Sequence, residues 1–259
     1  MNPGNGRASG LDVSELHGAS MPRSPQRLPS GDGRKLAEQV ALEIEADTID
    51  AGWPVGEVLG SETELIERYG VSRAVFREAV RIVEHHMVAR MRRGPGGGLV
   101  VTAPDLNAAQ RSVALYLDYA NVHADDMFEA RTAIETTAVR VATERLTEEG
   151  VVRLREMLAA EIRPDAEVLE SGQAHDLHVT IAALTGNPAL HLFSQILISL
   201  TFQRTGTRPR QYDAKAAAHE AHCAHEAIVE AMVQGDTDLA VYRMRRHLQA
   251  VATFFPERD

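Results

Sequence analysis

The C-terminal part of the sequence is rich in histidine, a side chain that commonly binds transition metals. Of the eleven histidines in the 259-residue chain, eight lie after residue 105, and those most relevant to metal chemistry are His175, His178, His219, His222, His225 and His247. Three neutral imidazoles can hold a metal ion and leave one coordination position open, where the ion can exchange an external ligand. The pattern raises metal binding as a hypothesis. The alternative is that these histidines are hydrogen-bonded polar groups inside a helical bundle.

A catalytic zinc site is the less favoured interpretation of these histidines. A metallohydrolase needs a general base beside the metal, and the signature His-Glu-x-x-His supplies it on one helix face. The run His219-Glu220-Ala221-His222 has the wrong spacing for that signature. We therefore expect a three-histidine metallohydrolase to be the wrong class and the protein not to be an enzyme.

A second group of chemically suited side chains is a run of arginines. Residues 68–93 hold seven arginines and two acidic residues, although the whole chain has a net charge of −10. Arg73, Arg77 and Arg81 recur every four residues, so a helix places them along one stripe. Arginine can form two hydrogen bonds with guanine in the DNA major groove. A solvated helix face is the alternative, because charge alone does not identify a DNA site.

The segments around these arginines predict a helix-turn-helix. Apolar residues at helical spacing predict helices over 35–48, 62–68 and 73–85. Ser61 and Glu64 fit a capping box at the start of the second helix. Gly70 supplies a tight turn, and Ser72 can cap the third helix. The third helix then has its N-terminal end free to enter the major groove, with the Ser72 hydroxyl near a phosphate.

A β-hairpin follows the third helix. Two short strands, 87–92 and 99–102, surround a glycine-rich turn. The glycines at 96–98 let the backbone approach the minor groove closely. The order of helix, helix, turn, helix and hairpin predicts a winged helix-turn-helix.

The rest of the chain predicts a mainly α protein in two domains. Residues 1–33 are rich in Gly, Pro, Ser and Arg and are expected to form a disordered tail. Residues 34–104 form the winged DNA-binding domain. Residues 105–259 show amphipathic helical stretches and predict an antiparallel all-α bundle. The net negative charge of this bundle would repel DNA, which leaves the winged domain as the DNA reader.

Composition narrows the class further. No run of 18 apolar residues occurs, so a membrane span is not expected, and the N-terminus lacks the apolar region of a secretory signal. The single cysteine, Cys223, excludes an internal disulfide framework and a cysteine-rich zinc module. The expected location is the cytoplasm.

From Leu36 to Val101 the sequence resembles the GntR family of bacterial transcription regulators. The resemblance is carried by Gly56-Glu57-Val58-Leu59, Ser61-Glu62-Thr63-Glu64-Leu65, Gly70-Val71-Ser72-Arg73, Phe76-Arg77-Glu78-Ala79-Val80 and the glycine-rich wing. Thr63 stands where the family often has arginine, and Ala74 and Val75 replace commoner small hydroxyl residues. Taken with the helix-turn-helix geometry, the resemblance implies DNA contacts from Ser72, Arg73, Ala74, Arg77, Arg92 and Gly97.

Residues 105–255 resemble the effector-binding helical domain (FCD domain) of the FadR subfamily. The resemblance runs from Arg131-x-x-x-Glu135 through Gly186-Asn187-Pro188 to His247-Leu248. It suggests that Arg131 points inward and holds an effector carboxylate, although Arg131 could instead pair with Glu135 one turn later.

The same resemblance implies a metal site. In metal-binding members the ligands are one aspartate and three histidines. Carried over, the histidines are His178, His225 and His247, while the aspartate position is Ala174. His175, one turn before His178, could substitute for the carboxylate or contact the effector. The expected cofactor is a divalent ion such as zinc, nickel or manganese.

These features predict a ligand-responsive transcription regulator, a repressor that binds double-stranded DNA as a homodimer. Two copies read the two half-sites of a pseudo-palindromic operator. Small organic acids are the first effector class, and a fatty acyl effector bound without metal is the alternative. A DNA-free interaction module would leave Arg73, Arg77 and the wing without a purpose.

Overall fold

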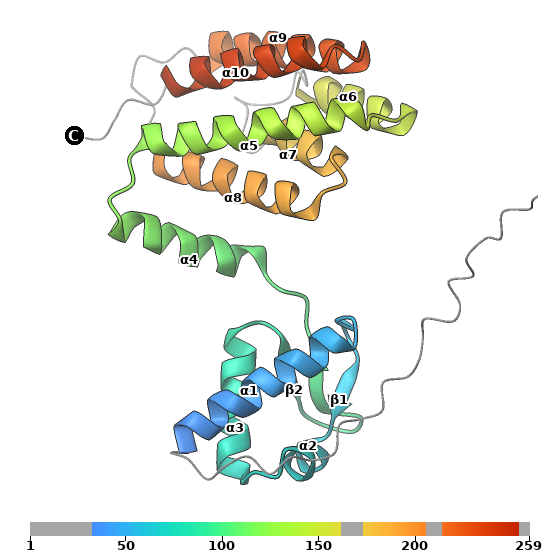
Figure 1. Cartoon of the computed structure of the whole chain (residues 1–259), viewed down its shortest axis with the longest axis vertical. Coiled ribbons are helices and arrows are strands. Elements are labelled where there is room, and N and C mark those ends of the chain that lie inside the picture. Colours follow the sequence, from blue (N-terminus) through green and yellow to red (C-terminus); the bar gives the residue numbers. More distant parts are fainter. Residues whose placement is uncertain (1–32, 162–172, 206–213, 254–259) are drawn as a thin grey trace, which may run out of the picture. The chain divides into compact units, whose positions relative to one another are not determined.

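The computed structural model describes residues 33–161, 173–205 and 214–253. It divides into two compact units, residues 1–105 and residues 106–259 (Figure 1). The expected tail of residues 1–33 lies outside the described residues except for Gly33, where the first helix already begins. The fold class predicted from the sequence, mainly α with a small winged unit and an all-helical unit, is confirmed.

The N-terminal unit is a winged helix-turn-helix. Its elements are α1 (Gly33–Asp50), β1 (Val58–Gly60), α2 (Glu62–Tyr69), α3 (Arg73–His85), β2 (Ala89–Arg92) and β3 (Gly98–Val101). The strands form an antiparallel sheet in the order β1-β3-β2, with Arg90 paired to Val100 across the hairpin. Strand β1 has no counterpart among the predicted strands, because three residues, the last of them Gly60, are too few to show a two-residue period.

A small apolar core sets the position of α3 in this unit. Val40 and Ile44 of α1 are buried together with Phe76 and Val83 of α3 and Leu99 of β3. The apolar residues of α3 recur at three- and four-residue spacing, so this helix buries one face and exposes the opposite one. The arginine stripe therefore lies outside the core.

Local hydrogen bonds fix where α2 and α3 begin. The Glu64 amide donates to Ser61 Oγ at 3.3 Å, and the Ser61 amide donates to Glu64 Oε2 at 2.8 Å, which completes the capping box. Gly70 ends α2 with a φ of 63°, a left-handed conformation that glycine adopts without strain. Ser72 then caps α3 through the Val75 amide at 3.4 Å.

In the described residues every regular element of the C-terminal unit is a helix. Its elements are α4 (Leu106–Tyr119), α5 (Ala124–Glu144), α6 (Glu148–Glu161), α7 (Gln173–Leu184), α8 (Pro188–Thr205), α9 (Ala214–Val233) and α10 (Thr237–Thr253). Helix α5 lies between the α9–α10 pair and the α7–α8 pair and packs against α10, α8, α7 and α9 (Figure 1). None of the helices in the described ranges is long and apolar enough to cross a membrane.

Two apolar clusters hold this bundle together. The larger one joins α5, α6, α7, α9 and α10 and includes Val139, Leu154, Ile181, Ile228 and Met244. The smaller one joins the start of α5 to α8, with the inner face of α4 packed against it. Helices α5, α7, α9 and α10 thus come together within one core, and each of them brings polar side chains into it.

Candidate functional site

The N-terminal end of α3 carries the expected DNA-contacting arginines. Arg73 and Arg77 are both exposed and lie one turn apart. Glu62, the first residue of α2, contacts both of them: its Oε1 lies 3.0 Å from Arg73 Nε and 3.4 Å from Arg77 Nε. Each guanidinium carries four further N–H bonds on its terminal nitrogens, which are the groups that bond guanine. Glu62 therefore holds the two arginines by their inner nitrogens.

The other predicted residues of this helix end lie beside the arginines. Ser72 is exposed, and its oxygen already accepts the Val75 amide, while its own O–H remains a donor suited to a phosphate oxygen. Ala74 is exposed and has no polar group to contribute beyond its backbone. Arg81, one turn further, pairs with Glu78 at 2.9 Å.

The wing residues have a local structural role. Arg92 Nη2 donates to the carbonyl oxygen of Gly96 at 2.9 Å across the turn. A Cβ on Gly97 would clash with the carbonyl oxygens of Arg92 and Gly94. The turn therefore requires glycine at 97 whether or not DNA is bound.

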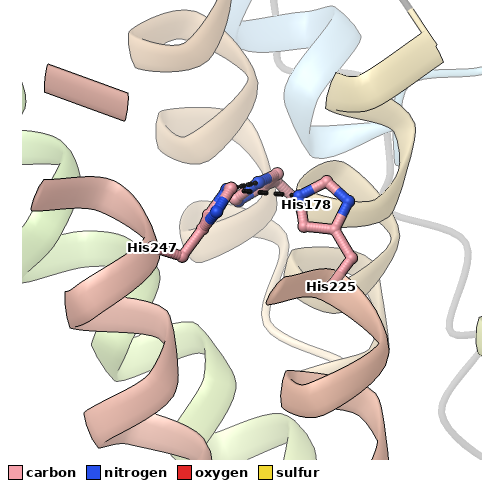
Figure 2. Close-up of side chains that lie close together, drawn as sticks. All are labelled: His178, His225 and His247. Atoms are coloured by element: carbon pink, nitrogen blue, oxygen red, sulfur yellow. Dashed lines mark hydrogen bonds between the residues drawn. The ribbon is translucent and has the colours of Figure 1, made fainter. Parts of the chain in front are cut away.

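In the C-terminal unit three histidines from three helices meet at one point. His178 of α7, His225 of α9 and His247 of α10 are all buried. Their rings converge (Figure 2), with His247 Nε2 lying 3.2 Å from His178 Nε2 and 3.2 Å from His225 Nε2. One nitrogen from each ring lies within 4.8 Å of the others. The structure thus brings together the three histidines that the sequence predicted as ligands.

Carboxylates hold two of these rings from behind. His178 Nδ1 donates to Glu135 Oε2 at 2.5 Å, and His225 Nδ1 donates to Glu161 Oε1 at 2.7 Å. Burial alone would raise the pKa of Glu135, but Arg131 and His178 outweigh it and lower that pKa to about 2. Burial also opposes ionisation of Glu161, and the hydrogen bonds from His225 and His222 lower its pKa nonetheless. Both carboxyl groups are therefore ionised acceptors.

These hydrogen bonds determine which ring nitrogens carry lone pairs. Because a carboxylate only accepts, the Nδ1 atoms of His178 and His225 carry the hydrogens, and in neutral rings their Nε2 atoms are bare. His247 Nε2 faces both bare nitrogens and has at most one hydrogen to give. Burial lowers the pKa of His225 and, with the neighbouring histidines, lowers that of His247 strongly, which opposes adding a proton. At most one of the two Nε2···Nε2 contacts can therefore be a hydrogen bond, and the other has no hydrogen between its nitrogens.

A cation between the three nitrogens would remove that conflict. Two imidazole nitrogens bound to one tetrahedral zinc at 2.0–2.1 Å lie roughly 3.3 Å apart. The two N···N separations of 3.2 Å match this edge length. Carboxylates on the far ring nitrogens are the usual outer partners of metal-bound histidine. The donor set fits a divalent transition metal ion.

Arg131 is the charged group next to this cluster. Its side chain is 2% exposed, and its Nε donates to Glu135 Oε1 at 2.6 Å, so the predicted pairing one turn apart is present. The guanidinium carbon lies 5.6 Å from the ring centres of Phe128 and Phe202. Among the described residues Arg131 Nη1 has no hydrogen-bond partner. A buried guanidinium N–H without a partner is costly, and an anionic ligand would satisfy it.

Some predicted residues fall elsewhere, and others were missed. The side chains of Ala174 and His175 lie outside the described residues. His219 and Cys223 are exposed. His222 was considered among the metal-relevant histidines but not as a ligand, and Glu161 was not considered; in the structure His222 Nδ1 donates to Glu161 Oε2 at 2.8 Å. The spacing of three between His222 and His225 is the one signal that could have suggested a shared partner.

Each of the two units matches a known protein family. Residues 36–99 match the family described as bacterial regulatory proteins, gntR family, and residues 126–250 match the FCD domain. The HTH-type transcriptional repressor NanR of Cronobacter sakazakii is 26% identical over 97% of this chain and 94% of that protein. The Exu regulon transcriptional regulator of Escherichia coli K12 is 24% identical over 83% of each. Streptococcus agalactiae GntR shares the fold, with a TM-score of 0.63 and 20% identity over 84% of this chain and 99% of that one.

Proposed function

Because the chain belongs to the gntR family of bacterial regulatory proteins and carries an FCD domain, we propose that it is a repressor that releases its operator when it binds a small organic acid. The chain is a ligand-responsive DNA-binding transcription regulator and not an enzyme. Repression is inferred from the similar NanR protein, whose name describes a transcriptional repressor. Such a protein acts where the chromosome is, in the bacterial cytoplasm.

We assign DNA binding to residues 34–104 and effector binding to residues 105–259. Arg73 and Arg77 are the proposed base-reading residues, because they are exposed at the end of α3 that enters the major groove in this motif. Ser72, Ala74, Arg92 and Gly97 complete the proposed DNA surface through hydroxyl, backbone and phosphate contacts.

The observation that carries the effector proposal is that Nη1 of buried Arg131 has no hydrogen-bond partner in the part of the chain that the structure describes. The hydrogen bond to Glu135 uses Nε, so a carboxylate of the effector can accept from Nη1. Phe128 and Phe202 flank the guanidinium and would pack against the carbon skeleton of the acid. This combination favours a small acid over a neutral ligand.

We further propose that His178, His225 and His247 hold a divalent ion, with zinc, nickel and manganese as candidates. When bound, such an ion supplies positive charge in addition to that of Arg131 and so attracts an anionic effector. The three rings are pre-positioned by their own helices and by Glu135 and Glu161, so little reorganisation is required.

A homodimer is the proposed assembly, because one winged unit reads only a half-site. An exposed apolar surface on helix α4 supports a contact with a second copy of the chain. Its outer face exposes Leu115, Tyr116 and Tyr119, of which the two tyrosines are 68% and 84% exposed. Large apolar side chains clustered on one face are typical of protein–protein contacts.

The effector proposal is tested by operator release in wild type and in an Arg131 variant. Arg131→Lys keeps a positive charge beside buried Glu135 but removes the fork that grips a carboxylate. Arg140→Lys, on the exposed face of the same helix, is the matched control. Small mono- and dicarboxylic acids should release an in vitro selected operator from wild type and from the control, while Arg131→Lys should need at least about tenfold more acid.

Two results would overturn this proposal. Equal acid sensitivity of Arg131→Lys and wild type would remove Arg131 from the effector site. Release by a fatty acyl compound or a neutral ligand, with no response to small acids, would establish a different effector class.

A further inference from the structure

A carboxylate outside the three-histidine cluster is bound by two imidazoles of one helix. Glu161 is the last residue of α6, and its side chain is 6% exposed. Its Oε1 accepts from His225 Nδ1 at 2.7 Å, and its Oε2 accepts from His222 Nδ1 at 2.8 Å. His222 and His225 are three residues apart on α9 and so lie on the same helix face. Each oxygen of this carboxylate thus has its own imidazole donor.

We propose that Glu161 is a positioning residue of the metal centre, which fixes the ring of His225 so that its Nε2 lone pair faces His178 and His247. The inference rests on the proposed metal site for its function. The hydrogens on Nδ1 of His222 and His225 follow from their hydrogen bonds to Glu161 and do not require an ion.

The bridge requires two acceptors, and a carboxylate provides them. Both imidazoles present Nδ1, and an ionised carboxylate cannot donate, so both Nδ1 atoms must carry hydrogen. For His225 this leaves the lone pair on Nε2, the nitrogen 3.2 Å from His247 Nε2. Were the hydrogen on Nε2 instead, it would occupy the position of the ion. Glu161 therefore selects the tautomer of His225 that can bind a metal.

His222 restrains the carboxylate itself. It holds Oε2, and its other nitrogen lies 3.5 Å from Glu226 Oε1, an exposed residue one turn along α9. With both oxygens engaged, the carboxylate of Glu161 cannot rotate away from His225. The same contacts connect the end of α6 to α9, two helices that also pack against each other.

Glu161 also differs from Glu135 in its electrostatic role. Glu135 contacts both His178 and Arg131, so much of its charge is offset by the guanidinium. Glu161 contacts two imidazoles, so its carboxylate lies directly on the outer side of His225. Three neutral imidazoles bring no charge to an ion, and a carboxylate behind one of them raises its basicity as a ligand.

The variant Glu161→Gln tests the proposal because glutamine is nearly isosteric yet has one acceptor and one donor end. One of the two imidazoles must then face an N–H₂ group and move its own hydrogen to Nε2, or lose its hydrogen bond. Glu156→Gln, at an exposed position of the same helix, is the matched control. His222→Ala is a second variant that loosens the carboxylate without replacing it.

Two readouts separate positioning from a merely structural link between α6 and α9. Long-range ¹H–¹⁵N NMR of the metal-free protein reports which nitrogen of His225 carries hydrogen. We expect Nδ1–H in wild type and in Glu156→Gln, and a mixed or Nε2–H form in Glu161→Gln. Zinc affinity, measured by competition with a chromophoric chelator, should fall about 10- to 100-fold in Glu161→Gln, the usual loss for an outer partner of a metal-bound histidine. It should fall less in His222→Ala.

The outcomes distinguish this inference from the proposed metal site. If wild type binds no divalent ion while Glu161→Gln changes the His225 tautomer, the metal proposal fails and the positioning role stands. An unchanged tautomer together with unchanged zinc affinity in Glu161→Gln would overturn the positioning role. If Glu161→Gln does not fold, His222→Ala decides: a lowered zinc affinity supports the proposal, and an affinity equal to that of wild type contradicts it.

Discussion

In the DNA-binding unit two arginines, Arg73 and Arg77, share one carboxylate, that of Glu62. Arg73 and Arg77 would repel each other at close range, and Glu62 lies between their Nε atoms. In solvent such exposed ion pairs contribute little to stability. We expect their effect to be on geometry, because they keep two long side chains at the end of α3 that enters the major groove.

We predict that Arg73→Ala and Arg77→Ala each weaken specific operator binding by about 1–3 kcal/mol where a bidentate guanine contact is lost. Both side chains are exposed, so circular dichroism and thermal stability should stay near wild type. Arg81→Ala, one turn further along the stripe, should have a smaller effect. Operator affinity, measured by fluorescence anisotropy at fixed salt, would contradict the assignment if it were unchanged in both variants.

A second residue-scale prediction concerns Glu62→Gln. Removing the carboxylate lowers the negative charge beside the phosphates, so affinity for random DNA should rise by several-fold. The arginines also lose their shared anchor, so the ratio of operator to random-DNA affinity should fall. Glu67→Gln, an exposed position of the same helix, controls for the change of charge alone. Equal specificity ratios in the two variants would show that Glu62 acts only through its charge.

At the scale of elements, the capping box of α2 places Glu62 where the arginines meet it. Ser61→Ala removes the acceptor for the Glu64 amide and should destabilise the protein by about 1 kcal/mol, the usual cost of a lost serine cap. Thr63→Ala is the control, since Thr63 is exposed and alanine favours helix. Urea unfolding of both variants measures the difference. Equal midpoints would mean that the cap does not hold α2.

The elements also show what the sequence could reveal. The bounds of α3 are predictable because Gly70, Ser72 and the apolar spacing all agree, and each acts through neighbours in the chain. Strand β1 is not predictable, because its pairing with β3 joins residues about 40 positions apart and its three residues have no period. The metal ligands were selected by family resemblance. Their outer carboxylates were not predicted: Glu135 was expected only as a partner of Arg131, and Glu161 meets α9 only through the packing of α6.

At the scale of the whole molecule, bound metal should stabilise the folded chain. An ion that binds only the folded state adds about 2.7 kcal/mol at a concentration 100 times its Kd. Removing it with a chelator should therefore lower Tm, and adding zinc should restore it. His247→Gln should respond to neither treatment, because two imidazoles remain. Purified wild-type protein without metal, with a Tm that no divalent ion changes, would contradict the proposed site.

The central claim is that occupation of the helical unit and operator binding by the winged unit are coupled. Coupling is reciprocal: if an acid weakens operator binding by some factor, the operator must weaken acid binding by the same factor. Calorimetric titration of the acid into free and operator-bound protein measures this directly. We predict a weaker Kd for the acid on the operator complex, by about 5- to 150-fold, equal to the loss of operator affinity at saturating acid. Identical Kd values for the acid on free and operator-bound protein would contradict the account.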